Sequence, residues 1–244
     1  MSKGKPHLRE VRRGALADAP VQPQVASWSV TADEITEGKG TRLDAGSYEP
    51  GLTETLDELA AGAKELVPLG DLAHVSLGKW FERVFTDDPE HGVPYCNPTD
   101  LLNLMAFGVP QAIRYLSPAT NTDIDRLLIR EGWLLLTCSG SVSRVFYVGQ
   151  RLHGWVATHD IVRIVPHDGL TGYIYAWLTT PQAKKHIAGH QHGGVVQHIT
   201  EEQVAESLVP RFSATVEGRI NKVVMRALKD RERAIETLVS AWEI

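Results

Sequence analysis

The sequence predicts a mixed α/β (α+β) fold, with a small mixed sheet flanked by helices, followed by one long C-terminal helix. Short β-rich apolar runs at residues 132–137 and 145–148 are separated by a loop of Gly and Ser residues, which is typical of such a sheet. Thr200 precedes Gln203 at the spacing of a capping box, which indicates a helix start. From Val216 onward apolar residues recur every three or four positions, which indicates an amphipathic helix of roughly 40 Å.

The chain divides into three segments. Residues 1–66 combine a proline-containing arm with an apolar helical period over residues 52–66. Residues 67–213 contain the predicted strands and loops, so they are expected to form the main domain. Residues 214–244 form the long helix, which is longer than one small domain needs and therefore requires a partner helix.

The expected elements of the main domain follow from its apolar periods and turn residues. Strands are expected within 75–100, including 92–96, and at 132–137, 145–148 and 155–165, with helices at 121–129, 172–178, 181–187 and 200–207. The Asn-Pro-Thr-Asp sequence at 97–100 is expected to form a turn. Tyr173, Tyr175 and Trp177 alternate with apolar residues, which favours the core over a stacking platform for bases.

Composition indicates a globular protein of a reducing compartment. Hydrophobic residues make up 43% and charged residues 23% of the sequence, which excludes a disordered or fibrous chain. No apolar run is long enough to span a bilayer, and no signal peptide is recognised at the N-terminus. The two cysteines, Cys96 and Cys138, are far apart, which excludes a zinc site built from cysteines. We therefore expect a cytoplasmic protein without membrane contact.

Charge is distributed unevenly along the chain. The formal net charge of −5 argues against indiscriminate nucleic-acid binding. Residues 17–66 are acidic, whereas residues 121–200 lean basic and contain seven of the ten histidines. Since lysine and arginine bind phosphate, residues 121–200 are the part best suited to nucleic acid.

Polar loops mounted on the predicted sheet are the candidate recognition surface. Arg144, which follows the Ser/Gly loop, is the strongest single candidate for a DNA contact, and its alternative is a structural ion pair with Asp160 or Glu131. A basic and aromatic cluster near residue 80 is a second candidate, and its alternative is an ordinary exposed hairpin. The candidate DNA-binding residues are Lys79, Trp80, Arg83, Ser139, Ser141, Ser143, Arg144, His159, His190, His192 and Gln197.

Three patterns that suggest enzyme chemistry are weak. Four histidines lie within residues 186–198, but glycines interrupt the helix there and no carboxylate accompanies them, so a solvated or DNA-facing loop is favoured over zinc. Residues 97–100 differ from the Asn-Pro-Pro-aromatic motif of adenine methyltransferases in their last two positions. The Gly-Ser pair at 140–141 lacks the nucleophile-elbow pattern. We expect no metal and no cofactor.

Five short stretches follow one another in order: RLDA at 42–45, LGDL at 69–72, GVPY at 92–95, GWLLLTCSGSV at 132–142 and GGVVQHI at 193–199. Together they resemble the specificity subunit of type I restriction–modification systems, in particular one target-recognition domain followed by one spacer helix. The resemblance extends from Arg42 to Ile244. It implies a sequence reader of duplex DNA that has no catalytic residues and that holds methyltransferase and nuclease subunits on DNA.

A full specificity subunit of that family carries two recognition domains and two spacer helices, whereas this sequence contains no internal repeat. The resemblance therefore implies a half-subunit or the reader of a single-site system. Expected partners are double-stranded DNA and an adenine methyltransferase subunit, with or without a restriction subunit. Two rival functions stay open: a small nuclease or methyltransferase, for which a cofactor loop or metal cluster is missing from the sequence, and a pure assembly protein.

The C-terminal helix is expected to act in assembly as a coiled-coil spacer. An uncovered apolar stripe of this length would form an exposed patch that monomers rarely tolerate. Two half-subunits are therefore expected to cross their helices antiparallel in a homodimer, which would set two recognition domains at a fixed separation. The residues expected at this contact are Ile220, Val223, Leu228, Ile235 and Leu238.

Overall fold

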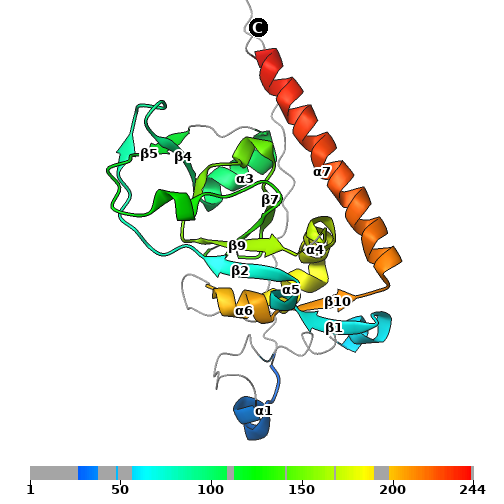
Figure 1. Ribbon diagram of the computed structural model, residues 1–244. Helices are drawn as coiled ribbons and strands as arrows, with labels where there is room; N and C mark the ends of the chain where they lie inside the picture. The colour runs from blue at the N-terminus through cyan, green and yellow to red at the C-terminus, as the bar shows by residue number, and fades with distance from the viewer. Residues whose placement is uncertain are drawn as a thin grey trace, which may run out of the picture.

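The computed structural model describes residues 27–37, 48, 57–108, 113–140, 142–167, 169–189 and 198–242 (Figure 1). The predicted DNA-binding residues Ser141, His190, His192 and Gln197 lie outside these ranges, as does the RLDA stretch. Within the described ranges, no helix combines the length and the apolar character that a membrane span requires.

The centre of the domain is a four-stranded antiparallel sheet in the order β2-β9-β6-β7 (Figure 1). Leu134 and Leu136 enter one core cluster and Leu135 enters another, because neighbouring strand residues point to opposite faces. Every residue of the strand at 134–137 is buried, so this strand is covered on both faces, which explains its largely apolar sequence. The strands are β2 (Ala73–Leu77), β9 (Ile161–Pro166), β6 (Leu134–Thr137) and β7 (Val145–Tyr147).

Helices cover one face of the central sheet, and a second sheet with one helix covers the other. The covering helices on the first face are α4 (Thr171–Leu178), α5 (Pro181–Ala188) and α6 (Glu201–Glu206). The second sheet has the order β3-β5-β4-β8, and its β4 and β8 pair in parallel, so the architecture is mixed as predicted. The elements on the second face are α3 (Pro98–Phe107), β3 (Phe85–Thr86), β5 (Arg114–Leu116), β4 (Val93–Cys96) and β8 (Val156–Ala157).

A two-stranded sheet joins the beginning of the domain to its end. Its strands are β1 (Glu65–Pro68) and β10 (Leu208–Arg211), which pair antiparallel with Val67 opposite Val209. This pairing brings the chain that enters the domain next to the chain that leaves it for the C-terminal helix. The remaining short elements are α1 (Ala32–Glu37) and the 3-10 helices η2 (Leu69–Asp71), η3 (Ile124–Leu127) and η4 (Gln150–Leu152).

The structure corrects several expected elements. The helix expected at 52–66 is helical at 57–62, but the residues from Glu65 form β1, because pairing with β10 overrides the helical period. The expected turn at 97–100 is the start of α3, where Asn97 and Asp100 form a capping box. The strand expected at 155–165 is two strands, β8 and β9, that belong to different sheets.

The C-terminal helix α7 (Ala214–Trp242) lies along its own domain (Figure 1). The side-chain oxygen of Asn221 accepts hydrogen bonds from two backbone N–H groups at the start of α4, at 2.7 and 3.2 Å, and so caps that helix. Farther along, the carboxylate of Glu232 accepts a hydrogen bond from the N–H of Gln150 at 3.2 Å. The predicted long helix is therefore confirmed, and part of its partner surface is the domain itself.

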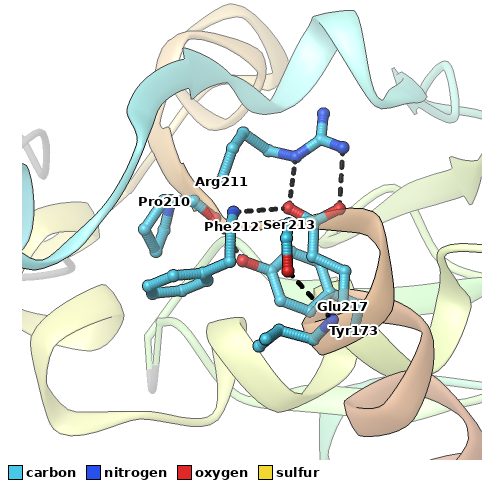
Figure 2. Close-up of polar contacts among 7 residues, drawn as sticks. Tyr173, Pro210, Arg211, Phe212, Ser213 and Glu217 are labelled. Carbon is cyan, nitrogen blue, oxygen red and sulfur yellow. Dashed lines mark hydrogen bonds and ion pairs between the residues drawn. The ribbon is translucent and has the colours of Figure 1, made fainter.

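An ion pair between Arg211 and Glu217 holds the start of α7 (Figure 2). The Arg211 guanidinium donates to both carboxylate oxygens at 2.8 Å, and the N–H of Phe212 donates to Oε1 at 2.7 Å. Glu217 is 4% exposed, and beside it the hydroxyl of Tyr173 donates to the carbonyl of Pro210. This buried network fixes the direction in which α7 leaves β10.

Candidate nucleic-acid interface

The carboxyl ends of β2 and β6 lie at the same edge of the central sheet as the amino end of β9. This arrangement follows from the pairing, since β2 and β6 both run antiparallel to β9: Leu77 lies opposite Val162 and Thr137 lies opposite Ile161. The loops that follow Leu77 and Thr137 therefore meet the turn that precedes Ile161. These connections carry many of the residues that the sequence predicts to bind DNA.

A cleft of about 570 Å³ opens at this edge, which we call the sheet-edge cleft. It brings together the predicted residues Lys79 and His159, which are far apart in the sequence. The predicted residue Ser139 forms a backbone bridge with His198, and His198 lines the cleft although it was not a predicted DNA contact. The lining residues are Leu77, Gly78, Lys79, Cys138, His159, Asp160, His198, Ile199, Thr200, Glu201 and Glu202.

Hydrogen bonds connect the loops around the sheet-edge cleft. The N–H of Cys138 donates to the carbonyl of Asp160 at 3.1 Å, and the N–H of Ile199 donates to the carbonyl of Cys138 at 3.0 Å. The carboxylate of Glu201 accepts a hydrogen bond from the N–H of Leu77. The predicted capping box at the start of α6 is confirmed. The walls of the cleft are therefore tied to the central sheet and to α6.

The connection between β6 and β7 presents Arg144 to solvent. Its backbone N–H donates to Thr137 Oγ1 at 3.1 Å, while its side chain pairs, among the described residues, with neither Asp160 nor Glu131. The alternative structural ion pair is therefore not formed. Ser143 corrects an expectation, because it is 4% exposed at a positive φ of 67°, so the turn buries its side chain instead of offering it to DNA.

The connection between β2 and β3 carries Lys79, Trp80 and Arg83. Because β2 and β3 belong to different sheets, this connection is not the hairpin considered as its alternative. Phe81 is buried and anchors the middle of the connection, whereas Trp80 is 68% exposed. The guanidinium of Arg83 donates to the hydroxyl of Tyr95 at 3.1 Å. The three predicted residues therefore lie on a connection that is anchored to the domain.

A second arginine, Arg114 of β5, also contacts Tyr95. Its guanidinium is 5.2 Å from the ring centroids of both Phe85 and Tyr95, and it donates to the carboxylate of Asp100 at 3.0 Å. Both arginines thus contact Tyr95. Sequence reasoning missed Arg114, because its partners come from β3, β4 and α3, which meet only in the folded chain.

Residues 63–210 match the family described as "Type I restriction modification DNA specificity domain". The chain belongs to this family. The matched residues contain both large sheets and the sheet-edge cleft, and they end shortly before α7. No curated protein sequence matches the chain.

Solved structures from type I systems resemble this specificity domain in fold. The S subunit of a type I restriction–modification system from M. genitalium is 15% identical with a TM-score of 0.50, over 72% of this chain and 42% of that one. The HsdS subunit from Thermoanaerobacter tengcongensis is 15% identical with a TM-score of 0.49, over 77% and 46%. A chain from a study of complex assembly and conformational transition of the type I R-M system is 13% identical with a TM-score of 0.51, over 79% and 50%. This chain spans about half the length of these proteins.

The residues of the expected assembly stripe of α7 differ in how far the domain covers them. Leu228 is 8% exposed and Ile220 packs against the main core, while Ile235 lines a pocket of about 310 Å³ between α3, β7 and α7. These three residues face their own domain, because the helix lies along it. Val223 and Leu238 are 62% and 55% exposed, so the domain does not cover them. The 310 Å³ pocket is more enclosed than the sheet-edge cleft but contains no predicted DNA-binding residue.

Among the described residues of this specificity domain, we find no arrangement of side chains that supports a zinc site or a catalytic cysteine. His186 is buried, and its Nε2 accepts a hydrogen bond from the N–H of Leu208 at 3.0 Å, which gives it a packing role. No group of three metal-ligating side chains occurs within the described ranges. Burial raises the pKa of the Cys96 and Cys138 thiols to about 12, so both stay protonated and are poor nucleophiles.

Proposed function

We propose that the chain is the DNA sequence-recognition (specificity) subunit of a type I-like restriction–modification or other methyltransferase-based defence complex. The observation that carries the proposal is the family match over residues 63–210, which include all residues that line the sheet-edge cleft. Lys79 and His159 line that cleft and Ser139 borders it, while Arg144 is exposed on a neighbouring loop. In this proposal, side chains at the cleft read base edges in the major groove, and arginine and lysine bind phosphates.

We further propose that the chain does no chemistry of its own. Its family is one of specificity domains, and its two thiols are held protonated by burial. Methylation would come from an adenine methyltransferase subunit, and cleavage, where it occurs, from a restriction subunit. These partners would dock on the assembled specificity subunit while it stays on DNA.

We propose that two copies pair through the exposed apolar residues of α7. Val216, Val223 and Leu238 are large apolar residues of this helix that the domain leaves exposed. The chain spans about half the length of the type I proteins it resembles in fold, so two copies would supply two recognition domains. An antiparallel crossing of the helices would then give a split, symmetric DNA target.

The test is to prepare the chain with its methyltransferase partner and to select bound duplexes from a randomised pool at physiological salt. We expect enrichment of one target sequence, and adenine methylation only when both components are present. Lack of any enrichment, or methylation or cleavage by the chain alone, would contradict the proposal. Partner binding without DNA preference would favour a pure assembly protein instead.

A further inference from the structure

The sheet-edge cleft is acidic, which is unusual for a surface that meets DNA. Its charged and imidazole side chains are Lys79, His159, His198, Asp160, Glu201 and Glu202. The lining of the cleft therefore contains three carboxylates, from Asp160, Glu201 and Glu202, and one ammonium group, from Lys79. An ionised carboxylate repels phosphate and can only accept hydrogen bonds. The cleft is thus suited to a DNA group that donates hydrogen bonds, which the backbone phosphates cannot do.

Two of the three carboxylates are half-buried. Glu201 accepts a hydrogen bond from the N–H of Leu77 and so holds the end of β2. The Oδ1 of Asp160 lies 3.8 Å from Nε2 of His159. Glu202 is exposed and forms no ion pair with any other described residue, and its carboxyl interacts with its own backbone N–H and the side chain of Thr200. Glu202 is therefore the carboxylate of the cleft that is most open to a ligand.

Glu202 and Lys79 reach the cleft from different elements, α6 and the connection after β2. No ion pair joins them in the described part of the chain, so neither neutralises the other. The backbone N–H of Glu202 and the side chain of Thr200 lower the pKa of the Glu202 carboxyl, which keeps it ionised at neutral pH. The cleft thus offers both a strong acceptor and a strong donor.

These two groups match the major-groove edge of one base pair. A C·G pair presents the N4 amino group of cytosine as a donor and the O6 and N7 atoms of guanine as acceptors. A carboxylate accepts from cytosine N4, and a lysine donates to guanine O6 and N7.

We propose that Glu202 determines specificity by accepting a hydrogen bond from the N4 amino group of a cytosine in the target, while Lys79 donates to the guanine paired with it. This inference rests on the proposed function and names the base pair that the sheet-edge cleft reads. It also gives the acidic lining a role, because the carboxylate selects against bases without an amino group at that position and against non-specific approach of phosphate.

The test compares wild type, Glu202→Ala and the control Glu206→Ala, each with the methyltransferase partner. Glu206 is an exposed carboxylate on the same helix that does not line the cleft. Alanine is used because a glutamine would keep an oxygen that accepts hydrogen bonds. Selection from a randomised pool first identifies the target of each protein. Each cytosine of the wild-type target is then replaced by its 4-deamino analogue. At one position we expect wild type and Glu206→Ala to lose about 10-fold or more in affinity. Glu202→Ala should not respond there and should accept other bases.

The outcomes separate the inference from the function on which it rests. No target enrichment with wild type means that the proposed function fails. An enriched target that Glu202→Ala reads with unchanged preference and unchanged dependence on the amino group overturns the inference alone. A uniform rise in affinity for all sequences would show that Glu202 only repels phosphate, which also overturns it. Dependence on an adenine N6 group instead of a cytosine N4 group overturns the assignment to a C·G pair.

Discussion

The guanidinium of Arg163 lies directly against Gly78, where an added Cβ would stand 2.8 Å from Nη1. Arg163 is 4% exposed and donates to the carbonyls of Ala157 and Ile161 at 2.6 and 3.2 Å. Burial lowers the pKa of this guanidinium, and no carboxylate in the described part of the chain pairs with it. Arg163 thus ties β8 and β9 to the connection that carries Lys79, so the position of that connection depends on a buried cation.

Replacing Gly78 by alanine should therefore destabilise the domain. The new Cβ would push the Arg163 guanidinium off its backbone partners, which should lower the free energy of unfolding by about 1–3 kcal/mol. Urea denaturation measures the change, and the DNA affinity of the folded fraction should fall as well. Gly62→Ala is the matched control, since a Cβ there meets no atom within 4 Å. Equal stability of the two variants would show that the contact is unimportant.

The contact between α4 and α7 gives a second pair of glycine variants. An added Cβ at Gly172 would stand 2.6 Å from the backbone carbonyl oxygen of Asn221, so Gly172→Ala should separate the helices and destabilise the protein by about 1–3 kcal/mol. Gly218 lies in α7 with open space around its Cβ position, so Gly218→Ala should stabilise by roughly 0.5–1 kcal/mol. Thermal and urea unfolding should show shifts of opposite sign; shifts of the same sign would refute the packing argument.

The junction between β10 and α7 should respond to acid. Hydrogen bonding to Arg211 lowers the pKa of the Glu217 carboxyl below its ordinary value. The native state therefore binds this proton less readily than the unfolded state, so the stabilisation is complete above about pH 4.3 and is lost as the pH falls through the lower native pKa. Glu217→Gln should reduce the dependence of unfolding free energy on pH below about 5. A slope identical to that of wild type would exclude this pair as an acid-sensitive element.

Removing the carboxylate entirely should be more damaging than neutralising it. Glu217→Ala leaves the partly buried Arg211 and the N–H of Phe212 without their acceptor, which should lower stability by about 3 kcal/mol at neutral pH. Glu236→Ala, an exposed carboxylate on the same helix, is the control and should change stability by less than about 0.5 kcal/mol. Comparable losses in the two variants would show that the junction contributes little.

Sequence patterns predicted the helices and strands that are determined by residues close to one another in the sequence. The capping box of α6, the buried strand β6 and the long helix α7 follow from the spacing of neighbouring residues, and the structure confirms them. The prediction failed where pairing with a segment far away in the sequence determines the secondary structure. Residues from Glu65 to Pro68 become a strand only because β10, far away in the sequence, pairs with them. The split of 155–165 into β8 and β9 likewise depends on which sheet each part joins.

The candidate site shows the same division. Lys79 and His159 are polar residues in loops, which the sequence indicates, but their meeting depends on β9 lying between β2 and β6. Spacing along the chain contains no signal for that order. Glu202 was not among the predicted residues, because nothing in the sequence places the start of α6 at the cleft.

Arg144 should contribute to DNA binding either as a base reader or as a phosphate contact. Arg144→Ala should weaken specific binding by about 1–3 kcal/mol if it reads a guanine, or flatten the dependence of log affinity on log salt by about one unit if it holds a phosphate. Fluorescence anisotropy with the selected duplex at several salt concentrations distinguishes the two. Arg126→Ala removes the same charge from an exposed arginine paired with Asp123 and serves as control. Unchanged affinity and salt slope in a folded Arg144 variant would remove this residue from the interface.

The buried and the exposed apolar residues of α7 should respond differently to the introduction of charge. Leu228 is 8% exposed against the domain, so Leu228→Asp places a carboxylate in an apolar contact and should destabilise the fold by several kcal/mol, on the order of 3. Val223 and Leu238 are 62% and 55% exposed, so changing both to Asp should leave the unfolding free energy within about 1 kcal/mol of wild type.

The double variant Val223→Asp, Leu238→Asp should instead lose assembly. The two carboxylates would enter an apolar contact between copies and repel one another across an antiparallel pair, so light scattering should show a folded monomer where wild type is a dimer. Recruitment of the methyltransferase partner should weaken as well, because it depends on the assembled helices. A wild-type chain that is monomeric without its partner, together with a double variant that binds the partner normally, would show that α7 serves only its own domain.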